Sequence, residues 1–203
     1  MFTEFEIDTL IDNEEVKSAT LALKKDFIKK EAPYLEISDE DFFSLILLTP
    51  TVGVDMADGK LSFSEEMALN KKARKLSKGG YFLKKDPVVF ALKYLIKTYD
   101  EWEERFLDVV KIAMAKSFDM STVKHDFDPN VEVSYEEYKR EILKTPYIFI
   151  RFIASFFMEE DEDIINSTTM TQTDHARMVD IGQKLGLADV PLFHYFQKHV
   201  NIK

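Results

Sequence analysis

The strongest constraint on the fold of this 203-residue chain is a repeated signal for the start of an α-helix. In four candidate helix starts a Ser or Thr is followed three positions later by Asp or Glu: Ser38 and Asp41, Ser62 and Glu65, Ser134 and Glu137, and Thr171 and Asp174. The hydroxyl can accept a hydrogen bond from an N–H of the first helical turn, and the acid can accept one from the capping residue's own N–H. The chain is therefore expected to consist mainly of helices.

Hydrophobic spacing and breaker residues support this expectation. In the predicted N-terminal helix, residues 12–32, apolar or small residues recur with helical spacing: Val16, Ala19, Thr20, Leu23 and Phe27. Pro33 follows and ends that helix. Asp86 and Pro87 have the form of an N-cap followed by proline at the first helical position. No region has the alternating pattern of a strand-rich fold.

Two segments with similar sequences predict an internal pseudo-repeat. Residues 37–50 read ISDEDFFSLILLTP and residues 133–146 read VSYEEYKREILKTP, with six of the fourteen positions identical. In both places an apolar stretch, an acidic loop and a capped helix follow. We therefore predict an all-α fold, a single helical bundle in one domain of residues 1–203, built from pseudo-repeated units at about 37–99 and 133–200. Pro50 and Pro146 should kink or break their helices.

Composition bears on the compartment. The chain has no Cys, which excludes disulfides and thiolate zinc sites. The N-terminus lacks the basic start and apolar core of a signal peptide. The most apolar stretch, Tyr147 to Met158, is shorter than the ~20 residues needed to span a bilayer. It predicts a central buried helix. The alternative is an exposed aromatic surface that binds a partner helix. A cytoplasmic protein without a transmembrane segment is expected.

The charge of the chain is uneven. The net charge of −10 argues against a nucleic-acid partner, but residues 60–85 contain eight Lys or Arg against two Glu. One interpretation is a solvated helix face whose basic residues complement the helix dipole. The other is a docking patch for an acidic protein partner or an anionic membrane surface. The candidate partner-binding residues are Lys71, Lys72, Lys75 and Lys78.

One acidic loop is a candidate metal site. Its carboxylates are Asp55, Asp58, Glu65 and Glu66, with Gly59 expected to turn the chain. If these carboxylates converge, they would suit a hard divalent cation, Ca²⁺ or Mg²⁺. The sequence argues against an EF-hand, because Val54 and Met56 occupy the positions where side-chain ligands are needed. The alternative is a helix–turn–helix with a capping box and no ion. The corresponding loop of the second unit, residues 159–163, consists of five acids.

Enzymatic motifs are missing from the sequence. The four histidines, His125, His175, His194 and His199, have no spacing typical of a metal site. The sequence also has no nucleophile-elbow motif, dinucleotide-binding motif or Cys nucleophile. An acid–base enzyme that uses carboxylates stays open, because such residues need only the fold to bring them together.

The loop from Ala57 to Glu65 resembles the signature loop of the TerB-like (tellurite-resistance TerB) helical family. The string reads Ala-Asp-Gly-x-Leu-Ser-x-x-Glu, and residues 181–187, Ile-Gly-x-x-Leu-Gly-Leu, are similar to the closing helices of that family. The resemblance covers residues 37–117 and 146–200. It implies a small all-α bundle with an acidic cluster suspected of binding a divalent metal, and a link to stress responses and membrane-associated assemblies. It nominates Asp58 and Glu65, with Asp55 beside them.

Two hypotheses for function follow. The first is a non-enzymatic TerB-like binding or scaffold protein, with a divalent cation at the acidic loop. The second is a helical protein–protein adaptor that uses the basic helix face and no metal. The third hypothesis is an acid–base enzyme that uses carboxylates.

Overall fold

The computed structural model describes residues 1–79, 86–158 and 163–203, and the all-α prediction is confirmed. The described helices are α1 (Glu4–Ile11), α2 (Glu14–Glu31), α3 (Asp39–Asp55), α4 (Phe63–Leu76), α5 (Pro87–Lys97), α6 (Tyr99–Ser117), α7 (Tyr135–Lys144), α8 (Tyr147–Phe157), α9 (Gln172–Lys184) and α10 (Pro191–His199). A short 3₁₀ helix, η1 (Met120–Val123), lies between α6 and α7. Strands β1 (Thr169–Met170) and β2 (Asn201–Ile202) form one parallel pair near the C-terminus.

The predicted Ser and Thr caps are found at four of these helices. Ser62, Ser134 and Thr171 each form the full reciprocal capping box with the acid three residues on. At α3, Ser38 accepts from the Asp41 N–H, while the buried Asp41 carboxylate accepts a hydrogen bond from the Lys78 N–H at 3.0 Å. The caps therefore explain where four helices begin.

The N-terminal segment contains one helix more than predicted. Residues 4–11 form α1, which begins with a capping box between Thr3 and Glu6. Asn13 then caps α2 by accepting hydrogen bonds from the N–H groups of Glu15 and Val16. The sequence prediction located α2 and its buried face but not α1.

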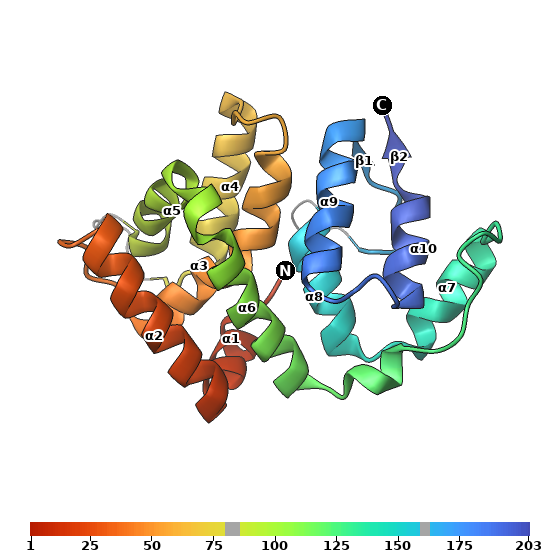
Figure 1. The fold of residues 1–203 in the computed structure, drawn as a ribbon, viewed down its shortest axis with the longest axis horizontal. Helices are drawn as coiled ribbons and strands as arrows, with labels where there is room; N and C mark the ends of the chain where they lie inside the picture. The colour runs from red at the N-terminus through yellow and green to blue at the C-terminus, as the bar shows by residue number, and fades with distance from the viewer. Residues whose placement is uncertain (80–85, 159–162) are drawn as a thin grey trace.

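Helix α3 lies at the centre of the fold. It packs against α1, α2, α4, α5, α6, α8 and α9. Every residue from Asp41 to Val54 is buried. Figure 1 shows α1 to α6 on one side and α7 to α10 on the other, with α6 leading through η1 to α7. Helix α3 therefore contacts elements from both sides of the molecule.

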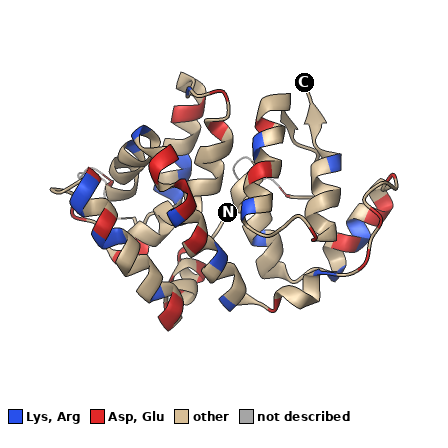
Figure 2. Ribbon diagram, viewed as in Figure 1, with Lys and Arg blue, Asp and Glu red and all other residues tan. Residues whose placement is uncertain are grey.

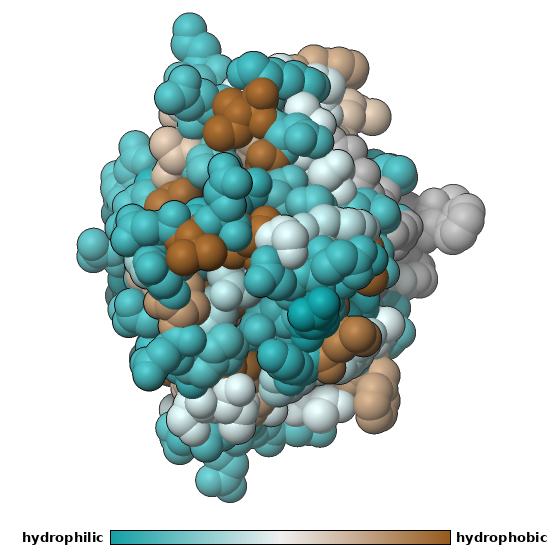
Figure 3. All heavy atoms as spheres, turned by 90° about the vertical axis from the view of Figure 1, so that its right-hand side faces the viewer, coloured by the Kyte–Doolittle hydropathy of each residue, from teal (hydrophilic) through white to brown (hydrophobic). Residues whose placement is uncertain are grey.

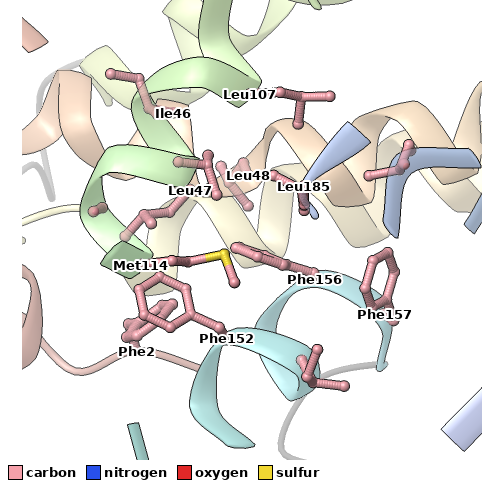
Figure 4. Close-up of a cluster of buried hydrophobic side chains, with 14 of the residues drawn as sticks. Phe2, Ile46, Leu47, Leu48, Leu107, Met114, Phe152, Phe156, Phe157 and Leu185 are labelled. Carbon is pink, nitrogen blue, oxygen red and sulfur yellow. The ribbon is translucent and has the colours of Figure 1, made fainter. Parts of the chain in front are cut away.

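The core between the two sides is rich in Phe side chains. Phe152 and Phe156 of α8 lie beside Phe2 and Met114 in Figure 4, and the Phe2 and Phe152 rings meet edge to face at 5.0 Å. One hydrophobic cluster contains buried residues from Phe2 to Val200. The prediction that the stretch from Tyr147 forms a buried helix is confirmed for most of α8, although Tyr147 itself is exposed.

Both prolines of the pseudo-repeat were expected to kink or break a helix, and they behave differently. Helix α7 ends at Lys144 and α8 begins at Tyr147, so the chain breaks at Pro146. Helix α3 continues through Pro50 to Asp55, so a break at Pro50 is wrong. The pseudo-repeat itself stays a prediction.

Candidate functional site

The predicted metal loop connects α3 to α4. Asp58 is exposed, and its Oδ1 accepts a hydrogen bond from the Lys60 N–H at 3.0 Å. Gly59 has φ of +80°, the left-handed conformation that an Asp-Gly turn needs. Glu65 Oε2 accepts from the Ser62 N–H at 2.6 Å. The loop therefore uses Asp58 and Glu65 to satisfy neighbouring backbone N–H groups.

The two remaining carboxylates do not complete a metal-binding group. Asp55 is the half-buried last residue of α3, and Glu66 is exposed in the first turn of α4. Within the described part of the chain, no three His, Cys, Asp or Glu residues are placed to hold a metal ion together. Cation binding here stays a prediction. In the acidic loop of the second unit, residues 159–162 lie outside the described residues.

The predicted basic face on α4 is interrupted. Lys71 and Lys75 are exposed, but Lys72 is only 6% exposed and its Nζ donates to the Met158 carbonyl oxygen at 2.8 Å. Met158 is the C-cap of α8, where a cation complements the helix dipole. Lys72 therefore joins α4 to α8 inside the molecule, with its aliphatic stem buried.

Lys78, just beyond α4, also serves an internal contact. Its Nζ lies 3.1 Å from Asp8 Oδ1 and 3.5 Å from Glu40 Oε1. The hydrogen bond to Asp8 raises the pKa of the Lys78 ammonium above its ordinary value. The four predicted lysines thus do not form one continuous exposed face. Lys84 and Lys85 of the basic stretch lie outside the described residues.

A polar cluster that the sequence did not predict joins α6 to α9. Glu103 Oε1 lies 2.9 Å from Arg177 Nη2 and 3.1 Å from Lys184 Nζ, with the Glu103 side chain 10% exposed. Asp180 Oδ2 is bound to both of these basic residues, at 2.5 Å from Arg177 Nη1 and 3.1 Å from Lys184 Nζ. Both carboxylates are therefore paired with the same two basic residues, and the cluster links α6 to α9.

The cluster adjoins the middle of α3. Tyr99 Oη donates to the Thr49 carbonyl oxygen at 3.1 Å, and Arg177 Nε donates to the Gly53 carbonyl oxygen at 3.4 Å. Burial raises the pKa of the Tyr99 hydroxyl above its ordinary value. The signal available in the sequence was the helical spacing of Arg177 with Asp180 and Lys184, which was not singled out.

A second polar pair lies on the other side of the molecule. His125 Nε2 lies 2.7 Å from Glu141 Oε1, with the Glu141 side chain 7% exposed. The hydrogen bond to Glu141 raises the pKa of the His125 imidazole above its ordinary value. The other ring nitrogen lies 3.3 Å from the Asp126 carbonyl oxygen. With contacts at both nitrogens, His125 fastens the segment between η1 and α7 to α7.

An open groove of about 490 Å³ runs along α2. Its apolar lining comes from Leu21 and Ile28 of α2 and from Pro33 and Leu35 of the segment that follows. Leu21 is 41% exposed, and Tyr34, between the two lining residues of that segment, is 96% exposed. We call this surface the α2 groove. No sequence prediction pointed to it.

The border of the α2 groove is basic. Lys24 Nζ donates to the Ile37 carbonyl oxygen at 2.6 Å and to Asp39 Oδ1 at 2.7 Å, so this lysine is held in place. Lys25 and Lys29 are exposed, and among the described residues neither has an ion-pair partner. Blue Lys and Arg positions recur along α2 in Figure 2.

A second groove of about 410 Å³ lies between α1, α6 and α8. Phe5, 79% exposed, and Ile148 contribute apolar surface to it. Its charged residues already have partners, because Glu6 is bound to Arg151 at 3.0 Å and Lys116 Nζ to Glu15 at 2.5 Å. It therefore lacks the unpaired charges of the α2 groove.

The surface on the side of α7 and α10 differs from the α2 groove. This side, which is on the right in Figure 1, has hydrophobic residues in separate patches between hydrophilic ones (Figure 3).

Comparison of the chain with protein-family models, curated proteins and solved structures finds no match. The TerB-like resemblance therefore stays a prediction. In the described ranges, no helix has both the length and the apolar character needed to cross a bilayer.

Proposed function

We propose that this protein is a non-enzymatic helical adaptor that binds another protein through the α2 groove. The observation that carries this proposal is an open groove with an apolar lining, together with the 96% exposed Tyr34, which lies in the chain between the lining residues Pro33 and Leu35. Burial of apolar surface drives most protein–protein association. Tyr is among the residues that most often dominate binding energy at interfaces. The groove thus combines an apolar centre with an aromatic side chain ready to be covered.

The α2 groove takes the place of the basic face that the adaptor hypothesis first assigned to α4. On α4, Lys72 is buried against Met158, and Lys78 after α4 is bound to Asp8. On α2, by contrast, Lys25 and Lys29 border apolar surface. An adaptor with basic residues at its binding surface is therefore kept, with α2 as its location.

The interface would extend beyond the groove. Specific protein–protein interfaces bury about 800 Å² on each partner. The groove, its lysine border and Tyr34 form the central part of such a surface. The natural partner would cover Tyr34 as well as Leu21, so both residues report on binding.

A peptide-display selection on the immobilised full-length chain tests this proposal. We expect the native chain to select peptides whose binding is lost when Leu21→Asp places a charge in the groove. Tyr34→Ala should weaken the same peptides by about tenfold, the effect of removing an aromatic anchor at a hot spot.

The matched control is Leu143→Asp. Leu143 is an exposed leucine of α7, 86% exposed, outside the groove. Peptides selected by the native chain should bind this variant with unchanged affinity. If the selected peptides bind Leu21→Asp and Leu143→Asp equally well, the α2 groove is not the binding surface and the proposed function fails. Circular dichroism of each variant verifies that the fold is kept.

A further inference from the structure

We infer that the partner segment bound by the α2 groove is an acidic amphipathic α-helix. This inference rests on the proposed function and adds the chemical class of the partner. It depends on three features of the groove: the spacing of its apolar residues, its unpaired lysines and the fixed position of Lys24.

The spacing of the apolar residues suits a helix. Leu21 and Ile28 are seven positions apart on α2, which places them on one face about 10 Å apart along the axis. A partner helix lying along α2 presents apolar side chains at the same i, i+3 or i+4, and i+7 interval. Pro33 and Leu35 widen the apolar lining on one side. The groove therefore accommodates about two turns of helix.

The charges around the groove select for acids. Lys25 and Lys29 are one helical turn apart, are exposed and lack an ion-pair partner among the described residues. Two other exposed lysines already have partners: Lys30 of α2 binds Glu101, and Lys116 of α6 binds Glu15. In a chain of net charge −10, this unpaired basic pair on the edge of an apolar groove is complementary to a helix with Glu or Asp one turn apart.

Lys24 and Asp39 line the groove and are bound to each other. Their side chains lie 2.7 Å apart, and Lys24 also donates to the Ile37 carbonyl oxygen. This contact ties α2 to the start of α3, so the groove is formed before any partner binds. A preformed groove lowers the ordering cost of association.

An apolar lining favours a protein helix over the two other anionic partners. Nucleic acid and anionic lipid headgroups would be attracted by Lys25 and Lys29, but neither would use Leu21 and Ile28 as paired anchors. A second copy of this chain would have to supply the acidic helix itself. These occupants are distinguished in the experiment.

The probe is a fluorescein-labelled 16-residue synthetic peptide with Leu at i, i+4 and i+7 and Glu on the flanking positions. The control peptides are a version with Lys in place of every Glu and a scrambled version of the acidic peptide. Binding to the full-length chain is measured by fluorescence anisotropy at low and high salt. We expect the acidic peptide to bind most tightly, with an affinity that falls as the salt concentration rises.

The decisive variants reverse charges on two helices. The double variant Lys25→Glu/Lys29→Glu should weaken the acidic peptide by about tenfold or more and should gain affinity for the lysine peptide. Lys93→Glu/Lys97→Glu is the matched control, because these exposed lysines of α5 have the same spacing. This control should change the affinity less than about twofold.

Two results would overturn the inference and leave the adaptor proposal standing. In the first, the acidic and lysine peptides bind with equal affinity. In the second, Lys25→Glu/Lys29→Glu leaves the affinity for the acidic peptide unchanged. In both, binding of the displayed peptides still depends on Leu21. Groove-dependent binding of phosphatidylserine vesicles or single-stranded DNA in preference to the peptide would also overturn it, as would dimerisation in sedimentation velocity that Leu21→Asp abolishes. If neither peptides nor displayed sequences depend on Leu21, the proposed function fails as well.

Discussion

Two segments with similar sequences, residues 37–50 and 133–146, adopt different structures at the same Thr-Pro pair. In the first segment α3 passes through Thr49 and Pro50 without interruption. In the second, α7 stops before Thr145, which is extended with φ of −82° and ψ of 137°, and α8 begins after Pro146. The residue before proline generally prefers the extended region, so the second segment follows the local preference and the first does not.

Burial explains the difference. Proline inside a helix costs about 3 kcal/mol, whereas burying one large apolar side chain contributes about 1.5–3 kcal/mol. Helix α3 is buried on all sides around Pro50, and Thr51 Oγ1 donates to the Phe156 carbonyl oxygen at 3.1 Å. Helix α7 buries only Tyr138, Glu141 and Ile142. Tertiary packing therefore overrides the helix break only where the helix is fully enclosed.

The largest expected effect concerns Gly53, three residues after Pro50. A Cβ atom at this position would lie 2.2 Å from Tyr99 Oη and 2.7 Å from Cδ1 of Ile181. Phe149 stands at the corresponding position after Pro146 and is fully buried. We expect Gly53→Ala to destabilise the protein by about 3 kcal/mol, because the Tyr99 ring must move away from the Thr49 carbonyl oxygen. Urea unfolding followed by circular dichroism measures this loss.

Gly59→Ala is the control for the first experiment. Gly59 has φ of +80°, but no atom lies within 4 Å of its added Cβ. We expect Gly59→Ala to destabilise the protein by about 1 kcal/mol, the cost of placing a residue with a Cβ atom in the left-handed backbone conformation. Equal losses for the two variants would show that the close packing of α3 against α6 and α9 contributes nothing beyond backbone strain.

The next effect compares the two prolines directly. Pro50→Ala restores a backbone N–H in the middle of α3. We expect this variant to raise the free energy of unfolding by about 1–2 kcal/mol, because the gain in helix stability exceeds the loss from burying a smaller side chain. Pro146 has φ of −55° and ψ of 133°, which proline favours. Pro146→Ala should destabilise the protein by about 0.5–1 kcal/mol, because the unfolded chain gains conformational entropy when proline is removed. Opposite signs in urea unfolding would support the comparison. Destabilisation by both variants would mean that the Pro50 ring is needed for core packing.

Local sequence patterns predict where helices start but not which helices contact one another. Ser62, Ser134 and Thr171 located α4, α7 and α9, because capping depends on residues only three positions apart. The continuation of α3 through Pro50 depends on helices far away in the chain. So does the burial of Lys72, whose partner Met158 is 86 positions away. Neither can be derived from local spacing.

The candidate site shows the same limit. The buried face of α2 was predicted from Val16 and Leu23, but Leu21 and Ile28, seven apart on a neighbouring face, were not singled out. A second apolar stripe on an amphipathic helix was the available signal. Its meaning depends on the segment that follows α2, where Pro33 and Leu35 complete the groove. That arrangement is tertiary and has no pattern in the sequence.

A smaller effect is expected from pH and concerns only the C-terminal part of the chain, because the four histidines all lie at position 125 or later. The hydrogen bond that His125 donates to Glu141 raises the pKa of the imidazole above its ordinary value of 6.5, with burial and Lys144 opposing it. The stability that His125 contributes is therefore complete below pH 6.5 and is lost as the pH rises through its folded pKa. Burial and Lys198 lower the pKa of His194, so its contribution is complete above pH 6.5 and is lost as the pH falls.

Thermal melting between pH 5 and 9 tests these signs. The difference in Tm between native protein and His125→Gln should shrink as the pH rises, and the difference for His194→Gln should shrink as the pH falls. Hydrogen exchange should place both changes in α7 and α10, and leave α4 and α5 unaffected. Protection that changes equally in both regions would contradict the assignment of the pH response to the C-terminal part of the chain.

The smallest expected effect is at the Asp-Gly loop between α3 and α4. Asp58→Ala removes the hydrogen bond to the Lys60 N–H at an exposed turn, which should cost about 0.5 kcal/mol. Adding Ca²⁺ or Mg²⁺ to metal-stripped protein should leave this difference unchanged, because Glu65 is engaged with Ser62 and the loop carboxylates do not converge. A bound ion at 100 times its Kd would instead stabilise the native chain by about 2.7 kcal/mol. If thermal melting shows that gain in the native chain and not in Asp58→Ala, the loop must close around the ion at the expense of the α4 capping box. The TerB-like prediction would then be favoured over a loop that serves only as a turn.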